Sequence, residues 1–240
     1  AERLMDQAEG GMLPQAFRMK EQTWIMNMFF ETSMGLKGLA EVYRETRNDY
    51  HRDIMIRVVD RLLETFQTED GLWQAMQYGQ TGTVSTCNFF TKSFGYIVEG
   101  LMAVHDVASD RGYLDRAEVI AEHIVNAQDP DGSWPVRWDR PADEVGVSDK
   151  ATSLWALLFL RLYRQTRKER DRDAGMRALK WCMDNQYFGD DEAARGGIVG
   201  RSWPSGIIYR HWFDMITTYT MAWFGLALLE AIELGLEDEI

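Results

Sequence analysis

Residues 128–139 of the chain read QDPDGSWPVRWD, and the centre of this stretch has a second copy. The motif DGSW at residues 131–134 corresponds to DGLW at residues 70–73, 61 positions earlier. Asp-Gly favours a tight turn, and similarity at a fixed spacing is typical of repeat architectures. The motif therefore predicts a fold built from a repeated unit of about 60 residues.

Two kinds of predicted helix flank these loops. The helix after each loop is apolar almost all round, and the helix before it has one apolar stripe, as in Ile54, Val58, Leu62 and Phe66. The apolar, inner helices are predicted at residues 22–46, 87–107, 148–166 and 213–232, and the outer helices at residues 50–66, 113–127 and 173–186. No segment of any length shows the period-2 alternation of a strand, so we predict an all-α fold.

The alternation of the two helix types predicts the architecture. Helices buried all round must be walled by one-sided helices, which gives two concentric layers, an (α/α) toroid of helical hairpins. At about 61 residues per hairpin, 240 residues hold about four hairpins, a partial or incomplete ring. We expect one domain over residues 1–240 with an N-terminal extension at 1–20, in a processed protein or a fragment of a longer one.

Composition limits the classes of partner. The chain has 26 Lys and Arg against 38 Asp and Glu, a net charge of −12, which disfavours nucleic acid and anionic membranes. There is no apolar run of about 18 residues and no signal-peptide pattern, so we expect a soluble protein and favour the cytoplasm. Cys87 and Cys182 form no CxxC pair and HExxH is absent, so no metal or cofactor is expected. A homo-oligomer is left open.

The first loop leads into an inner helix rich in small and hydroxylated residues. DGLW is followed, through Tyr78 and Thr83, by TCNFFTKS at residues 86–93. This arrangement resembles the six-hairpin (α/α) toroid carbohydrate-active enzymes, above all the unsaturated glucuronyl and rhamnogalacturonyl hydrolases. The resemblance covers about residues 20–235 at the level of pattern. It implies a glycosidase of polysaccharide degradation with a general-acid Asp near an inner-helix start.

Carboxyl groups are the candidates for catalysis. Glycoside hydrolysis needs two carboxyls across a sugar, or one acting on the vinyl ether of an unsaturated uronide. Asp139, Asp149 and Asp214 are the candidates, and His211 could exchange protons near neutral pH. Asp149 stands at the start of an inner helix, where a simple N-cap is the alternative interpretation.

Aromatic and basic residues in the loops are the candidates for binding an oligosaccharide. Indole rings stack on pyranose faces, and guanidinium groups bind carboxylates. The candidates are Trp134, Arg137, Trp138, Asn88, Arg201, Trp203, Tyr209, Arg210 and Trp212. For the repeated Asp-Gly-x-Trp residues, a structural role between hairpins is favoured, whereas Arg137, Trp138 and Asp139 have no counterpart in the first copy.

Three other functions stay open. A polysaccharide lyase on uronate-containing glycans would use residue types that Asn88, His211, Tyr209 and Arg210 supply. Because DG-x-W loops also occur in terpene cyclases and protein prenyltransferases, an isoprenoid-binding toroid is a second alternative, although DxDD is missing. A non-catalytic sugar-binding or assembly domain is the third. Absorbance separates hydrolase from lyase, because one removes an unsaturated uronide and the other creates it.

Overall fold

The computed structural model of the chain describes residues 16–25, 32–73, 75–78, 84–87, 91–199 and 216–239. The contacts divide the chain into two compact units. Unit 1 comprises Ala1–Phe89 and Tyr96–Ile120, and unit 2 comprises Phe90–Gly95 and Ala121–Ile240. Within the described ranges, no helix combines the length and apolar character needed to cross a bilayer.

Unit 1 is built mainly from helices. It contains α2 (Thr32–Thr46), α3 (Asp49–Phe66), most of α4 (Thr91–His105), the short helix η1 (Ser109–Arg111) and most of α5 (Tyr113–Val125). The strands β1 (Ala16–Arg18) and β2 (Thr23–Ile25) form one antiparallel hairpin, and β3 (Ala75–Tyr78) and β4 (Val84–Cys87) form another. The ion pair Lys37–Glu99 joins α2 to α4, and Arg44–Asp106 joins α2 to the residue after α4, with N–O distances of 2.7 and 2.6 Å.

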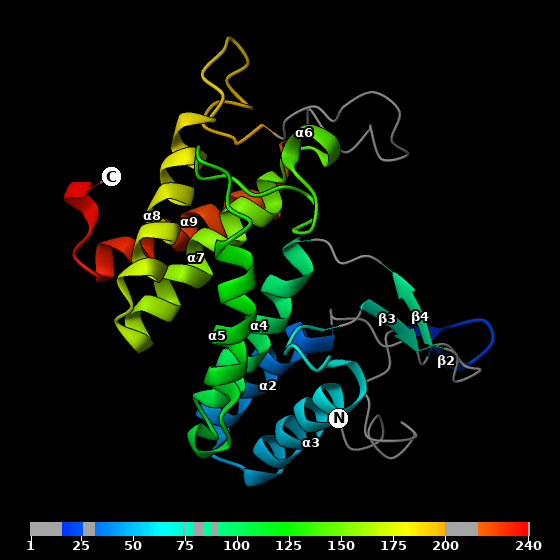
Figure 1. The fold of residues 1–240 in the computed structure, drawn as a ribbon. Helices are drawn as coiled ribbons and strands as arrows, with labels where there is room; N and C mark the ends of the chain where they lie inside the picture. Colours follow the sequence, from blue (N-terminus) through cyan, green and yellow to red (C-terminus); the bar gives the residue numbers. More distant parts are fainter. Residues whose placement is uncertain are drawn as a thin grey trace. The chain divides into compact units, whose positions relative to one another are not determined.

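Unit 2 is organised around one long helix. It contains α6 (Ala142–Val145), α7 (Asp149–Thr166), α8 (Glu169–Asp184), α9 (Thr218–Glu233) and the short helix η3 (Glu237–Glu239). Helix α7 packs against both α8 and α9 (Figure 1). The Ser148 hydroxyl caps α7 by accepting the Ala151 amide at 3.1 Å, and Arg167 ends the helix in the left-handed conformation, φ 58°.

The predicted alternation of inner and outer helices is confirmed for the middle of the chain. Helix α4 is buried on all sides from residue 93 to 104, and α7 from residue 151 to 160. Helices α3 and α8 bury one side, and the stripe of Ile54, Val58, Leu62 and Phe66 lies in the core. Each unit therefore contains a helix that is buried nearly all round and an outer helix that buries one side.

The first and last predicted inner helices differ from the prediction. Helix α9 buries Phe224, Ala227 and Ala231, but Leu229 and Ile232 are 58% and 53% exposed. Helix α2 likewise exposes Val42. All-round apolar character therefore predicted all-round burial wrongly for these helices, because burial requires a packing partner on each side.

Several predicted boundaries were also wrong. The inner helices predicted from residues 22, 87 and 213 begin at Thr32, Thr91 and Thr218. Strand β2 lies within a segment predicted as helix, and β4 ends at Cys87, where another helix was predicted to begin. Strands of three or four residues are too short to show a period-2 pattern, and antiparallel pairing of their backbones stabilises them.

The two DG loops have the same hydrogen bonds. The Gln67 side-chain amide donates to the Gly71 carbonyl at 3.2 Å, and Gln128 donates to Gly132 at 3.0 Å. Both glycines have positive φ, 81° and 94°, which favours glycine at these turns. The Asp carboxylate of each motif accepts the amide two residues later. The repeated motif therefore encodes a repeated turn.

Each DG loop is hydrogen-bonded to the outer helix that follows it. Arg116 of α5 donates to the Gln67 side chain, and Arg177 of α8 donates to the Gln128 side chain. A third loop has the same bond, from the Gln186 amide to the Gly196 carbonyl at 2.7 Å, and Gly196 also has positive φ. This loop lacks the Asp-Gly-x-Trp sequence, so only the structure identifies it as a third copy.

Candidate functional site

Asp149 is a buried carboxyl at the first position of α7. It is 5% exposed, and its Oδ2 accepts a hydrogen bond from the Thr220 hydroxyl of α9 at 2.9 Å. Burial raises the pKa of Asp149 above its ordinary value, while the Thr220 hydrogen bond and the Lys150 charge act in the opposite direction. A carboxyl that keeps its proton to higher pH is suited to donate that proton in a reaction.

A pair of hydroxyls and an amine lie near the Asp149 carboxyl. The Thr217 and Thr220 hydroxyls are 2.7 Å apart, and both residues are buried. The Lys150 amine lies 4.7 Å from the centre of the Tyr219 ring. Next to Thr217, Ile216 pairs with Val199 in an isolated bridge. The residues on either side of 200–215 therefore pair with each other next to the start of α9.

Many predicted site residues lie outside the described residues. Asn88 is one of them. The others are Arg201, Trp203, Tyr209, Arg210, His211, Trp212 and Asp214. Their roles stay predictions.

Arg137 and Asp139 form an ion pair within the second loop. The guanidinium donates twice, from Nε to Oδ1 at 3.0 Å and from Nη2 to Oδ2 at 2.6 Å. The hydrogen bond from Arg137 lowers the pKa of Asp139. Asp139 is thus suited to remain ionised rather than to donate a proton, and its two bonds occupy one edge of the Arg137 guanidinium.

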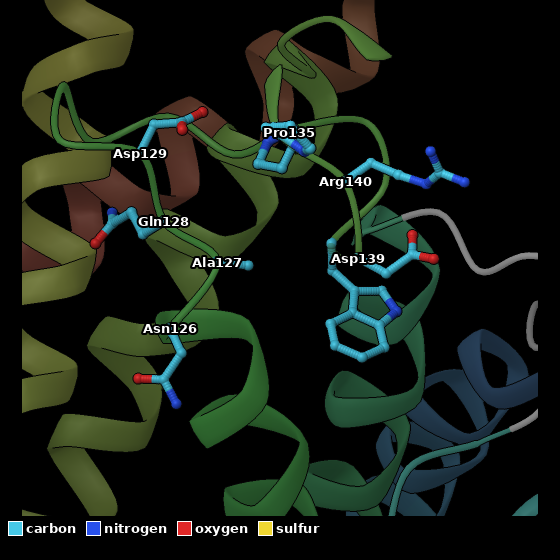
Figure 2. Close-up of a pocket in the computed structure, with 9 residues that line it drawn as sticks. Asn126, Ala127, Gln128, Asp129, Pro135, Asp139 and Arg140 are labelled. Atoms are coloured by element: carbon cyan, nitrogen blue, oxygen red, sulfur yellow. The ribbon is translucent and has the colours of Figure 1, made fainter. Parts of the chain in front are cut away.

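Trp138 is half-buried and borders a hollow of about 350 Å³. Its ring meets those of Phe94 and His123 edge-on, with centroids 6.0 and 6.2 Å away. Figure 2 shows Asn126, Gln128 and Asp129 along one segment of this hollow and Pro135, Asp139 and Arg140 along another. The hollow thus combines an indole with amide and carboxyl groups, the mixture that binds sugar rings.

Trp134 lies in the core, which corrects its prediction as a residue that stacks on substrate. The side chain is 0% exposed, and its Nε1 donates to the Ile124 carbonyl at 2.7 Å. The indole stacks on Phe159 with ring centroids 5.6 Å apart. Trp73 of the first copy is also buried. The repeated tryptophans fill the space beneath the loops, the structural role that the sequence favoured for them.

Sequence reasoning missed Asp129 and Thr220. Burial raises the pKa of Asp129, aided by the charges of Asp131 and Asp143, and its Oδ2 is enclosed without a hydrogen-bond partner among the described residues. Thr68 holds the matching position in the first copy, so the comparison of copies that selected Arg137 could have found Asp129. No pattern in the sequence links Thr220 to Asp149.

Metal ligands do not gather in the part of the chain that the structure describes. No group of three or more His, Cys, Asp or Glu side chains there could hold a metal ion. Cys182 is buried and free, and burial raises the pKa of its thiol.

Solved structures of carbohydrate-active enzymes share this fold. An unsaturated glucuronyl hydrolase specific for heparin has a TM-score of 0.77 and 16% sequence identity, over 97% of this chain and 66% of that one. The unsaturated glucuronyl hydrolase responsible for glycosaminoglycan degradation in Bacillus sp. GL1 has a TM-score of 0.74 and 16% identity, over 98% and 67%. A polysaccharide lyase has a TM-score of 0.67 and 15% identity, over 86% and 61%.

These similarities show the fold class, an (α/α) toroid of helical hairpins, as the sequence predicted. The resemblance to toroid carbohydrate-active enzymes is confirmed at the level of the fold. The chain spans about two thirds of the length of the two hydrolases. No protein-family model matches the chain, and no curated protein matches its sequence.

Proposed function

We propose that the protein cleaves glycosidic bonds in acidic or unsaturated oligosaccharides, with Asp149 as the proton donor. The observation that carries this proposal is the buried Asp149 carboxyl at the start of α7, whose pKa is raised by burial. The solved enzymes with this fold support the carbohydrate class of substrate.

One carboxyl suffices when the substrate is an unsaturated uronide. The double bond of its vinyl ether is electron-rich, so a carboxylic acid can protonate one carbon and water can add to the other. The resulting hemiketal opens, and the glycosidic bond breaks as the remaining sugar leaves as an alcohol. Asp139 has the opposite environment, because Arg137 keeps it ionised. Between the two described candidates for proton donor, burial therefore favours Asp149.

Substrate binding is assigned to the hollow beside Trp138. A half-buried indole can stack on a pyranose, and the side-chain amides of Asn126 and Gln128 can bond its hydroxyls. The Lys150 amine is next in sequence to Asp149 and could attract a substrate carboxylate. Further candidates are Trp203, Trp212, Arg201 and Arg210, which lie outside the described residues.

A thermal-shift screen with uronate-containing oligosaccharides would identify the substrate. Binding to the folded protein raises the melting temperature through mass action. We expect a shift with unsaturated or acidic sugars and none with neutral polymers of glucose. A panel in which no sugar changes the melting temperature would move the proposal toward an isoprenoid-binding or scaffold role.

An absorbance assay with Asp149→Asn tests the mechanism. Unsaturated uronides absorb in the ultraviolet, and hydrolysis should remove that absorbance. Loss of a positioned general acid should lower kcat by about 10²–10⁴. Asp171→Asn is the matched control, because Asp171 is also a buried Asp of unit 2 but lies on α8. Full turnover by Asp149→Asn would contradict the assignment of the acid.

A lyase is the second candidate, favoured by the polysaccharide lyase that shares the fold. A lyase abstracts the proton beside a uronate carboxylate and leaves a new double bond. Absorbance would then rise with saturated polyuronates instead of falling with unsaturated ones. The same assay with both substrates therefore distinguishes the two activities.

A further inference from the structure

Two buried threonine hydroxyls lead to the Asp149 carboxyl. Thr217 Oγ1 lies 2.7 Å from Thr220 Oγ1, and Thr220 Oγ1 lies 2.9 Å from Asp149 Oδ2. Thr220 is 0% exposed. The two threonines are three positions apart at the start of α9, so one helical turn aligns both hydroxyls with α7.

The chemistry of these groups fixes the direction of the chain when Asp149 is ionised. A carboxylate only accepts hydrogen bonds, and each hydroxyl has one hydrogen to donate. Thr220 therefore donates to Asp149, and Thr217 must donate to Thr220. Both donors point toward the carboxylate, which is the arrangement that a buried negative charge requires.

We propose that Thr220 is a positioning residue for Asp149: its hydroxyl holds Oδ2 as an acceptor and so orients the carboxyl that transfers the proton. This inference rests on the proposed function, in which Asp149 is the acid. Thr220 acts through Asp149 and need not touch the substrate. Thr217 orients Thr220 in the same way, one step further from the carboxyl.

Few other charged groups face Asp149 in the described structure. Lys150 adjoins it on α7, and Cys182 approaches from α8 with a thiol that burial keeps neutral. From α9 the Thr220 hydroxyl contacts the carboxyl. Removal of that hydroxyl should therefore change the protonation equilibrium of Asp149 without removing a charged group.

The test is the pH dependence of Asp149 in Thr220→Val and Thr220→Ser. Valine has nearly the shape of threonine but no donor, so the ionised carboxyl loses a hydrogen bond and the pKa of Asp149 rises by about one unit. Serine keeps the donor and should leave the pKa near that of the parent. A smaller rise is expected for Thr217→Val. The carboxyl is observed directly by NMR titration of ¹³C-labelled Asp, and the alkaline limb of kcat should move by the same amount.

The matched control is Thr166→Val. Thr166 is the last residue of α7, and its hydroxyl lies 3.5 Å from the buried Asp171 carboxyl of α8. This variant therefore also removes a hydroxyl beside a buried carboxyl. Its melting temperature should fall, with the Asp149 titration unchanged. An unshifted Asp149 midpoint in folded Thr220→Val overturns the inference and leaves the proposed function standing. Full activity of Asp149→Asn would instead refute the function.

Discussion

Trp134 and Trp138 are four positions apart in one loop but have different surroundings. Trp134 is enclosed by Ile124, Trp155 and Phe159, whereas Trp138 is half-buried beside the hollow. In the sequence both were candidates for stacking on a sugar. The useful signal was repetition. Trp134 has a counterpart in the first copy, Trp73, and serves the repeated turn, whereas Trp138 has none.

Alanine at each position should separate stability from binding. Trp134→Ala should lower the free energy of unfolding by about 3–5 kcal/mol through the cavity it leaves. Trp138→Ala should cost about 1 kcal/mol or less and weaken oligosaccharide binding by about tenfold, because its ring is the stacking surface. Urea unfolding and a binding titration measure the two effects. Equal losses of stability would show that Trp138 is also a core residue.

Replacement of Asp149 should change stability in the direction opposite to its effect on turnover. Its folded-state pKa is raised above the ordinary value of 3.8, so the folded protein binds more protons than the unfolded chain in the window above that value. Stability therefore falls as the pH rises through that window. Asp149→Asn removes this cost and still accepts from Thr220, so its melting temperature should exceed that of the parent by a few degrees at pH 7.

The difference between the two melting curves should vanish in acid. Below the ordinary pKa, Asp149 is protonated in both the folded and the unfolded chain. Scanning calorimetry from neutral to acidic pH measures this. A variant that is less stable than the parent at neutral pH, with the difference lost in acid, would show that the Asp149 charge stabilises the fold.

At the scale of elements, Gly132 of the second loop and Gly225 of α9 have opposite roles. Gly132 has φ 94°, and a Cβ there would clash with the backbone of Arg177. Gly225 lies inside α9 with no atom close to where its Cβ would be. One glycine is required by its turn, and the other only weakens its helix.

Alanine substitutions should show this difference. Gly132→Ala should destabilise the protein by about 2 kcal/mol or more, through a left-handed backbone and the contact with α8. Gly225→Ala should stabilise it by about 0.5–1 kcal/mol. Both are measured by denaturant midpoints at unchanged slope. Loss of stability in Gly225→Ala would mean that α9 needs a glycine for a reason other than its backbone.

The helices could be predicted where the apolar pattern of the sequence matches the burial that the fold provides. The stripe of α3 and the all-round apolar sequences of α4 and α7 predicted their burial, because each sequence meets a matching environment. The start of α4 was predicted four residues too early, at Cys87. This residue instead ends strand β4, where it pairs with Ala75 of β3. The Asp149–Thr220 contact was also beyond the sequence, because it depends on how α9 packs against α7.

At the scale of the whole molecule, net charge should influence the encounter with substrate. The chain carries a net charge of −12, and an oligosaccharide with uronate groups is also negative. Long-range repulsion should slow their association, and salt screens that repulsion. We therefore expect kcat/KM to rise about twofold from low to physiological ionic strength. A fall in kcat/KM with salt would show that local cations such as Lys150 govern the encounter.

The Gln–Gly hydrogen bond that closes the loops also has a consequence for protein engineering. In the first two loops the bond spans four positions, from Gln67 to Gly71 and from Gln128 to Gly132, but in the third it spans ten, from Gln186 to Gly196. The same Gln–Gly hydrogen bond therefore forms across chain segments of very different length. Foreign peptides grafted between Gln186 and Gly196 could give the scaffold new specificities while the helices keep their sequence.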